Sequence, residues 1–318
     1  MKNSGVFSDK KIIFICPKFI GYNEAIKTEI ENLGGYVLMF NDRPYNGVFD
    51  FFKKINISII KLYQNVNWYC RLRKIDLDSY NTLFVIRGEY VPLFVLDKCK
   101  KAGLEMIMYQ WDSVKNCNYL YQKDFFNKIS TFDGGDAKLY GFDYFPLFYR
   151  SEYAEIESRN SKTKTALFVG TFQMLRYSSV LELKERLNKV GIETIIKIRI
   201  PFYHYLKLLM KGVKLKKEYL FFKNISFSEI LMLYSSSDII IDAANENQRG
   251  LTMRTFEALG ANRILLTNNL SVKQEPFYDS KRIKFFDQEF FSETFNDDII
   301  SNLVKDQKLD NWILKLIN

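Results

Sequence analysis

The chain has 318 residues and a mass of 37.7 kDa. This exceeds the roughly 250–300 residues at which one hydrophobic core stops growing, so two domains are expected. The formal net charge of +9 predicts attraction to a polyanion: nucleic acid, an anionic membrane surface, or a phosphorylated substrate or carrier lipid. The single histidine, His204, nearly excludes a histidine-based triad and a multi-histidine metal site.

The cysteines and the apolar runs indicate a cytosolic protein. The cysteines lack the paired spacing of a zinc site or a redox motif, and we expect reduced thiols at Cys16, Cys70, Cys99 and Cys117. The N-terminal sequence MKNSGVFSDKKIIFICPK lacks the apolar region of a signal peptide. No run approaches the roughly 18 apolar residues of a membrane span, so we expect a protein that is soluble or bound to a membrane surface.

The first half of the chain alternates short apolar runs with helical patterns. KIIFIC predicts a buried strand at 11–16, GYNEAIKTEIENLGG a helix that stops at two glycines, and YVLMF a second strand at 36–40. This strand–helix–strand order predicts a parallel sheet. The pattern continues with a strand at 82–89, a helix at 92–103, a strand at 105–113, and a short strand, a helix and a strand-like run within 128–149.

The polar segment SEYAEIESRNSKTKT, residues 151–165, predicts a linker between an N-terminal domain of residues 1–150 and a C-terminal domain of residues 166–318. After it the pattern restarts, with strands at 166–170, 192–198 and 239–243 and helices at 178–191 and 226–238. The sequence thus predicts an α/β protein of two Rossmann-like parallel-sheet domains that face a cleft, with a last helix able to pack back on the N-terminal domain.

The segment NENQRGLTMRTFEALGANRILLTNN, residues 245–269, places charges around a glycine between two buried strands. Ligands of a parallel sheet bind at the carboxyl ends of its strands, and the N–H groups at a helix start suit a phosphate. Gly250 would admit a ligand to the backbone, Arg249 or Arg254 could bind its phosphate, and Glu257 could accept hydrogen bonds from ribose hydroxyls. In the structural alternative, Arg254 and Glu257 form a surface ion pair and Gly250 is a turn; spacing alone favours neither.

A second glycine loop, FVGTFQMLR at 168–176, follows a predicted strand. Gly170, Thr171 and Arg176 form a loop shaped to meet an anion near a helix start. The loop lacks the lysine and spacing of a P-loop and is not GxGxxG, so it is a weak signal by itself. A tight turn at Gly170 is the structural alternative.

Carboxylates follow the predicted strands of the first half, where a general base could deprotonate an acceptor hydroxyl: Glu89, Asp112, Asp133 and Asp136. We prefer Asp112 as the base, with Glu89 second, because Trp111 beside Asp112 could stack on a sugar ring. Asp133 and Asp136 are then candidates for binding the acceptor. The alternative for each carboxylate is a helix cap or a loop residue.

The stretch RIPFYHYLKLLMKGVKLKKEYLFFK, residues 199–223, carries seven basic residues against one acid, Glu218, interleaved with aromatic and aliphatic residues. Such a composition is typical of a helix lying on an anionic bilayer. RNA binding and a solvated helix face with its apolar side in the core are the alternatives.

The sequence DIIIDAANENQRGLTMRTFEALG followed by ILLTNN resembles the donor-binding segment of GT-B glycosyltransferases, in particular bacterial lipopolysaccharide and capsule biosynthesis proteins. FVGT with Arg176 resembles the first loop of a GT-B C-terminal domain, and VIRGE, YQWDS and FDGGD are similar to stretches of the same proteins. The resemblance implies that the residue at Glu257 holds the nucleotide's ribose and that the glycine loop before it faces the diphosphate. It implies a donor nucleotide site made of Gly170, Thr171, Arg176, Gly250, Leu251, Thr252, Arg254 and Glu257.

The chain departs from the pattern of many retaining GT-B enzymes, which have two glutamates in this motif. Arg249 stands eight positions before Glu257, at the position of the usual first glutamate. The motif therefore does not support a retaining mechanism. No DxD motif of the metal-dependent GT-A type appears in a convincing setting. GT-B enzymes generally need no metal, so neither a metal nor another cofactor is expected.

We therefore expect a metal-independent glycosyltransferase of cell-surface polysaccharide synthesis, such as that of O-antigen or capsule. The donor would be a nucleotide sugar, in the first place a UDP-sugar, and the acceptor a glycan or a polyprenyl-linked glycan. The protein would bind the inner face of the cell membrane through residues 199–223, without a nucleic-acid partner. Two alternatives are a catalytically idle GT-B scaffold and a basic nucleic-acid-binding protein.

Overall fold

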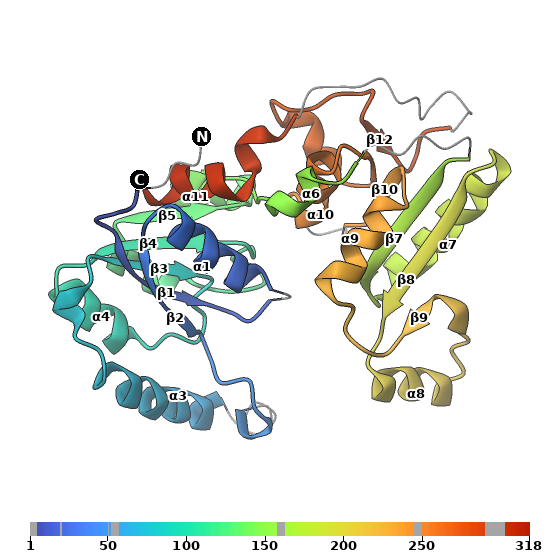
Figure 1. Ribbon diagram of the computed structural model, residues 1–318. Coiled ribbons are helices and arrows are strands. Elements are labelled where there is room, and N and C mark those ends of the chain that lie inside the picture. Colours follow the sequence, from blue (N-terminus) through green and yellow to red (C-terminus); the bar gives the residue numbers. More distant parts are fainter. Residues whose placement is uncertain are drawn as a thin grey trace. The chain divides into compact units, whose positions relative to one another are not determined.

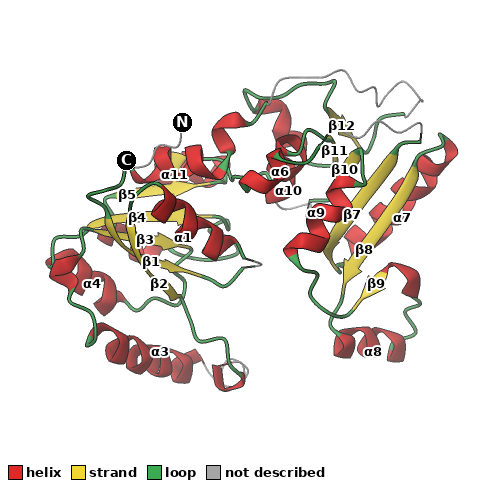
Figure 2. Ribbon diagram, in the orientation of Figure 1, coloured by secondary structure: helices red, strands yellow, loops and turns green. Residues whose placement is uncertain are grey.

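A computed structural model describes residues 5–19, 21–49, 51, 57–157, 163–244, 250–289 and 303–318. The chain forms two compact units (Figure 1): unit 1 is Met1–Pro146 with Leu309–Asn318, and unit 2 is Leu147–Lys308. Each unit contains a six-stranded sheet with helices beside it (Figure 2). All strand pairings are parallel, which confirms the predicted α/β class with two Rossmann-like sheets.

Unit 1 has the strand order β2-β1-β3-β4-β5-β6. Its strands are β1 Lys11–Cys16, β2 Tyr36–Asn41, β3 Thr82–Ile86, β4 Glu105–Gln110, β5 Lys128–Thr131 and β6 Asp143–Tyr144. Its helices are α1 Tyr22–Asn32, α3 Ile57–Leu72, α4 Leu93–Lys101, α5 Gly134–Tyr140 and α11 Leu309–Ile317, with 3₁₀ turns η1 Leu77–Ser79 and η2 Leu120–Phe125.

The apolar runs of the first half form the buried centre of this sheet. Every residue of β3 is buried, as are all but the first residues of β1 and β4. Trp68 of α3 and Leu96 of α4 belong to one buried cluster with Ile13 and Val85. Burial of each such side chain stabilises the fold by about 1.5–3 kcal/mol. The cluster therefore fixes the strands β1, β3 and β4, from whose carboxyl ends the loops extend.

Unit 2 has the strand order β12-β11-β10-β7-β8-β9. Its strands are β7 Thr165–Thr171, β8 Glu193–Arg199, β9 Leu220–Phe221, β10 Ile239–Asp242, β11 Ile264–Thr267 and β12 Ile283–Phe285. Its helices are α6 Ser151–Ala154, α7 Met174–Lys189, α8 Phe202–Met210, α9 Phe227–Ser235 and α10 Met253–Gly260, with 3₁₀ turns η3 Lys217–Tyr219, η4 Leu270–Gln274 and η6 Lys305–Gln307.

The order of strands in unit 2 reverses between β7 and β10. The chain runs outward from β7 through β8 to β9 and then from β10 through β11 to β12 on the other side. Loops that follow two neighbouring strands at such a switch point lead away in opposite directions, which opens a crevice at the carboxyl ends. The pairing of β7 with β10 covers only Ile239 with Ala166 and Ile240 with Leu167, so the two strands part before they end.

Helix α3 has no counterpart in the sequence-based prediction. Trp68 and Ile60 are buried, whereas Leu62 and Val66 are exposed, so its apolar residues cover more than one face and give no single amphipathic stripe. Helix α11, the last of the chain, packs against α1 of unit 1. The segment 151–165, expected to be a linker, contains α6 with the buried Tyr153 and the first residue of β7.

Candidate functional site

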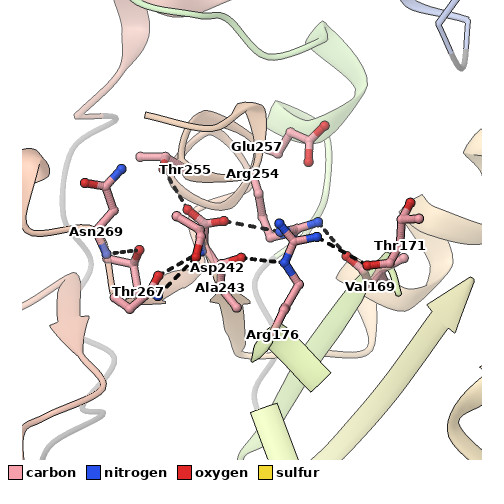
Figure 3. A network of polar contacts seen from close by, with 12 residues as sticks. Val169, Thr171, Arg176, Asp242, Ala243, Arg254, Thr255, Glu257, Thr267 and Asn269 are labelled. Carbon is pink, nitrogen blue, oxygen red and sulfur yellow. Dashed lines mark hydrogen bonds and ion pairs between the residues drawn. The ribbon is translucent and has the colours of Figure 1, made fainter. Parts of the chain in front are cut away.

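The carboxyl ends of β7 and β10 carry the polar cluster drawn in Figure 3. Asp242, the last residue of β10, is fully buried and accepts hydrogen bonds from Arg254 Nη1 at 3.2 Å and Thr255 Oγ1 at 3.3 Å. Arg254 also donates through Nη2 to the carbonyl oxygen of Val169 on β7. Its side chain therefore bridges the two strands where their own hydrogen bonding has ended.

Arg254 keeps part of its surface open, since its side chain is 23% exposed while Asp242 is at 0%. Burial alone would lower the pKa of Arg254, but the Asp242 carboxylate, Tyr234 and Glu257 outweigh it and raise the pKa. The guanidinium is thus charged, and part of its surface remains open to a ligand beside the buried carboxylate. The sequence-based alternative paired Arg254 with Glu257 on the surface, whereas in the structure Arg254 pairs with the buried Asp242.

Arg176, on the first turn of α7, lies beside Arg254. Its Nε donates to the carbonyl oxygen of Ala243 at 2.8 Å and its Nη1 to that of Thr171 at 3.2 Å. The pKa of Arg176 is lowered by burial and, next, by the positive charge of Arg254. The two guanidinium groups lie next to each other (Figure 3), and together they favour an anion that binds both.

Glu257 is held on the outward side of α10 by a residue that the sequence analysis did not identify. The hydroxyl of Tyr234, at the end of α9, donates to Glu257 Oε2 at 3.1 Å. Tyr234 is 2% exposed, and burial together with the charge of Glu257 raises its pKa well above the usual value, so this phenol remains a donor. Tyr234 therefore fixes the orientation of the carboxylate.

The loop between β10 and α10 is tied to the loop after β11 by two asparagines of the sequence ILLTNN. Asn268 accepts from the Ala244 N–H at 2.8 Å and donates to the Ala244 carbonyl at 3.2 Å, and Asn269 donates to the Gly250 carbonyl at 3.3 Å. The sequence offered one signal for this loop contact, two adjacent asparagines directly after a buried strand. The sequence analysis gave these two residues no role. Arg249 lies outside the described residues.

The start of α10 presents polar groups beside the arginines. Thr252 is the N-cap residue, but its side chain makes no capping hydrogen bond, and its Oγ1 is buried without a hydrogen-bond partner in the described part of the chain. Leu251 is buried at 3% exposure and anchors the turn. The first N–H groups of a helix are not used by the helix itself and suit an anion.

Two glycines of this region have packing reasons. A Cβ at Gly170 would lie 2.9 Å from the Phe168 ring, and one at Gly260 would lie 2.4 Å from the ring of Tyr149. Gly260 ends α10, as expected, and its lack of a side chain also lets the helix pack closely against the ring of Tyr149. Gly170 lies within β7 and is not the tight turn considered as the structural alternative, and its contact with a ligand stays a prediction.

Unit 1 places a second arginine and carboxylate group at the carboxyl ends of β3 and β4. Arg87 and Gly88 both have φ of 69°, in the left-handed region that is unfavourable for arginine. Gln110 Nε2 donates to the Arg87 carbonyl at 2.8 Å and Gln122 Nε2 to the Gly88 carbonyl at 3.0 Å, which holds the turn. Such strain is often found where a side chain must be aimed at a site.

The turn aims Arg87 at two candidate residues. Its Nη2 lies 3.3 Å from Glu89 Oε2 and its Nε lies 3.3 Å from Asp112 Oδ2, and both carboxylates are about one third exposed at 32% and 31%. Burial raises the pKa of Asp112, Arg87 opposes this shift, and Glu89 adds to it. Asp112 is thus an accessible carboxylate with a raised affinity for a proton, as a general base requires.

The other acceptor candidates serve local structure. Asp133 caps α5 by accepting from the N–H groups of Gly135 and Asp136, which is the alternative considered from the sequence. Asp136 accepts from the Val114 N–H at 2.7 Å and so fixes the loop after β4. The ring of Trp111 packs against that of Phe19, with 5.6 Å between the ring centroids. An acceptor-binding role for these side chains stays a prediction.

A pocket of about 860 Å³ in unit 1 adjoins the Arg87 group. Glu89, Asn116, Cys117 and Asn118 line it on that side, and residues of α3, of the start of α4 and of the segments at Tyr90 and Tyr121 line the rest. Burial raises the pKa of the Cys117 thiol. The arrangement offers a carboxylate and amide groups for hydrogen bonds to an acceptor.

Among the residues that the structure describes, no group of three or more His, Cys, Asp or Glu side chains is placed to hold a metal ion. No helix within these described ranges is both long enough and apolar enough to span a bilayer.

No protein-family model and no curated sequence matches the chain. Solved structures match its fold. The apo form of the lipopolysaccharide outer core galactosyltransferase WaaB is 12% identical, with a TM-score of 0.54 over 97% of this chain and 98% of that one. An α-glucosyltransferase in complex with UDP and a 13-mer DNA is 11% identical, with a TM-score of 0.53 over 89% and 83% of the two chains. The chain therefore has the GT-B fold, the fold of these glycosyltransferases.

Proposed function

We propose that the protein is a glycosyltransferase that takes a sugar from a nucleotide-activated donor. The observation that carries the proposal is the pair of guanidinium groups, Arg176 and Arg254, at the β7–β10 switch point. A diphosphate would bind both and would find the first N–H groups of α10 beside them. The α-glucosyltransferase of the same fold was solved with UDP, which supports a UDP-sugar as the donor.

Each donor residue has a separate role in this proposal. Arg176 and Arg254 stabilise the negative charge that grows on the diphosphate as the bond to the sugar breaks. Glu257, oriented by Tyr234, accepts hydrogen bonds from the ribose hydroxyls. Because the arginines supply the positive charge, transfer is expected to be independent of a metal, and a chelator should leave the rate unchanged.

The acceptor chemistry belongs to unit 1. Asp112 takes the proton of the acceptor hydroxyl while that oxygen forms a bond to the anomeric carbon, and the electron pair of the broken bond leaves with the diphosphate. Arg87 holds Asp112 in place at 3.3 Å, and Glu89 offers a second carboxylate. The acceptor is a glycan or a polyprenyl-linked glycan of cell-surface polysaccharide, in line with the lipopolysaccharide enzyme of the same fold.

Helix α8 is proposed to attach the protein to the cytoplasmic face of the membrane. Its exposed side chains are Phe202, Tyr203, Leu206, Leu209 and Met210, with exposures of 42–82%. Exposed lysines stand within the helix at 207 and after it at 211, 214, 216, 217 and 223. Apolar side chains enter the lipid and lysines bind anionic headgroups, so the two sets support each other.

The membrane contact is tested by sedimentation with vesicles. Vesicles of phosphatidylcholine and phosphatidylglycerol should bind the protein, and vesicles of phosphatidylcholine alone should bind it weakly. Met210→Asp should weaken binding, whereas Met232→Asp, at a residue of α9 that is 62% exposed, is the matched control. Equal binding of the two variants would contradict a role for α8.

The donor is tested by titration with UDP, GDP, CMP and dTDP, followed by a turnover assay with the sugar derivatives of the nucleotide that binds. We expect saturable binding of UDP and loss of affinity in Arg176→Ala and in Glu257→Ala. Binding of none of these nucleotides would contradict the proposal. Binding without turnover on any acceptor would identify an idle scaffold, and binding of unspecific RNA with a steep salt dependence would favour the nucleic-acid alternative.

A further inference from the structure

Arg199, the last residue of β8, lies next to the glycine loop of the proposed donor site. It is the register partner of Thr171 on β7, and its carbonyl oxygen accepts a hydrogen bond from the Phe172 N–H at 2.8 Å. The carbonyl oxygen of Thr171 in turn accepts from Arg176 Nη1. Neighbouring strands lie about 4.8 Å apart, so the backbone of Arg199 is one strand away from the proposed anion site.

The side chain of Arg199 belongs to the face of the sheet on which Arg254 is held. Ile198 of β8 packs in the buried cluster formed with α7. Successive side chains of a strand point to opposite faces, so Arg199 lies on the face away from α7. Ile241 of β10 is in the same cluster, which places Asp242 on that other face too, and Asp242 binds Arg254 at 3.2 Å. Cationic side chains therefore follow one another across β10, β7 and β8.

Arg199 differs from the other arginines in its lack of partners. Every other arginine within the described ranges donates a hydrogen bond, forms an ion pair or lies against an aromatic ring. Arg199 has no such contact in that part of the chain, and its Nε is buried without a hydrogen-bond partner. A partly buried cation without an anion is unfavourable, and a bound anion would remove this cost.

The chemistry of a nucleotide sugar limits which anion can bind Arg199. In the proposed site the diphosphate binds Arg176 and Arg254, which lie together in Figure 3. The uracil base and the ribose are uncharged. The remaining part of the donor is the sugar, which carries a carboxylate when it is a uronic acid. A guanidinium can donate two parallel hydrogen bonds to a carboxylate, and this pairing is stronger than one with a neutral hydroxyl.

We infer that the donor is a nucleotide-activated uronic acid and that Arg199 binds the carboxylate of its sugar. This inference rests on the proposed function, because it takes the diphosphate site of unit 2 as its starting point. It narrows the donor to acidic sugars and makes Arg199 the residue that selects them, since a neutral hexose leaves the guanidinium without an anion.

Titration of the full chain with uridine, UDP, UDP-glucose and UDP-glucuronate separates the parts of the donor. Wild type should bind UDP-glucuronate about tenfold more tightly than UDP-glucose, because hydrogen bonds between two charged groups are added. Arg199→Gln should remove this preference and change the Kd of uridine, UDP and UDP-glucose less than about twofold. Lys197→Gln, at an exposed residue two positions earlier on the same strand and face, is the matched control and should keep the preference.

Two results would overturn the assignment of Arg199. One is a wild type without preference for UDP-glucuronate, and the other is an equal loss of preference in Arg199→Gln and Lys197→Gln. Weaker binding of uridine or UDP by Arg199→Gln would also overturn it, since Arg199 would then contact the base or the diphosphate. UDP binding by wild type without the preference removes only the sugar assignment, whereas absence of UDP binding removes the donor site and the inference with it.

Discussion

Both units place an arginine and carboxylates at the carboxyl end of a parallel sheet, but they bury them differently. In unit 2 the carboxylate of Asp242 is fully buried and Arg254 spans from it to the neighbouring strand. In unit 1 Arg87 pairs with Asp112 and Glu89, which are each about one third exposed, at 31% and 32%. The carboxylate of the first group is thus enclosed, whereas the carboxylates of the second are open to a ligand; the two arginines are similarly exposed, at 23% and 25%.

This difference in burial indicates different roles for the carboxylates of the two units. A buried carboxylate that is satisfied by its partners holds a cation in position, so Asp242 positions Arg254. A carboxylate that is accessible and has a raised pKa can receive a proton from a ligand, so Asp112 is suited to chemistry. The comparison predicts that Asp112 matters for the rate and Asp242 for stability.

The largest effect is expected from Asp112→Asn. If Asp112 is the general base, kcat falls by about 10²–10⁴-fold, because the amide cannot take the proton. UDP affinity should remain unchanged, which calorimetric titration measures. Asp97→Asn is the control, since Asp97 is an exposed residue of α4 paired with Lys101, and a similar loss of kcat in that variant would contradict the assignment.

The next largest effect concerns stability. Asp242→Ala leaves Arg254 without its buried carboxylate and should lower the free energy of unfolding by about 3–5 kcal/mol. Asp112→Ala removes a partly exposed pair and should cost about 1 kcal/mol or less. Urea unfolding of both variants checks the order, and a larger loss in Asp112→Ala would reverse the roles drawn from burial.

A smaller effect is expected on nucleotide affinity. Glu257→Gln should weaken UDP binding about tenfold, because hydrogen bonds to a charged group contribute about 1.5–3 kcal/mol. Tyr234→Phe should weaken it about threefold, since the carboxylate stays but loses its orienting donor. Uridine, which keeps the ribose, should show the same losses; unchanged uridine affinity in Glu257→Gln would rule out the ribose contact.

The smallest effect is a shift of the pH profile. The pKa of Asp112 is raised by burial, so kcat/KM should lose activity on the acid side at a pH above that of an ordinary aspartate. Arg87 stabilises the ionised carboxylate, so Arg87→Gln should move this limb to higher pH by up to about one unit. Glu89 disfavours the ionised form, so Glu89→Gln should move it to lower pH, and a shift of both variants in one direction would contradict the arrangement.

The sequence predicted the fold where its apolar runs were short and bounded by turns. β1, β10 and β11 were visible because each is a buried run such as IIID, whereas the strand order of unit 2, and with it the switch point, was not predicted. Helix α3 was missed because its apolar residues occupy both buried and exposed faces.

The candidate site was predictable in its residues more than in its contacts. Arg176, Arg254 and Glu257 were named from a motif, but the partners Asp242 and Tyr234 lie 12 and 23 residues away from Arg254 and Glu257 and meet them only in the folded sheet. Asp133 shows the opposite limit, since a carboxylate after a strand fits a base and a helix cap equally well until the cap geometry is known.

The central claim is that the donor nucleotide binds unit 2 at the carboxyl ends of β7 and β10. Hydrogen–deuterium exchange of the full chain with and without saturating UDP tests it most directly. If UDP binds there, peptides covering residues 168–177 and 250–260 become protected, with no change in peptides covering residues 105–113 of unit 1. Unchanged exchange in both unit 2 peptides, or protection found only in unit 1, would contradict it.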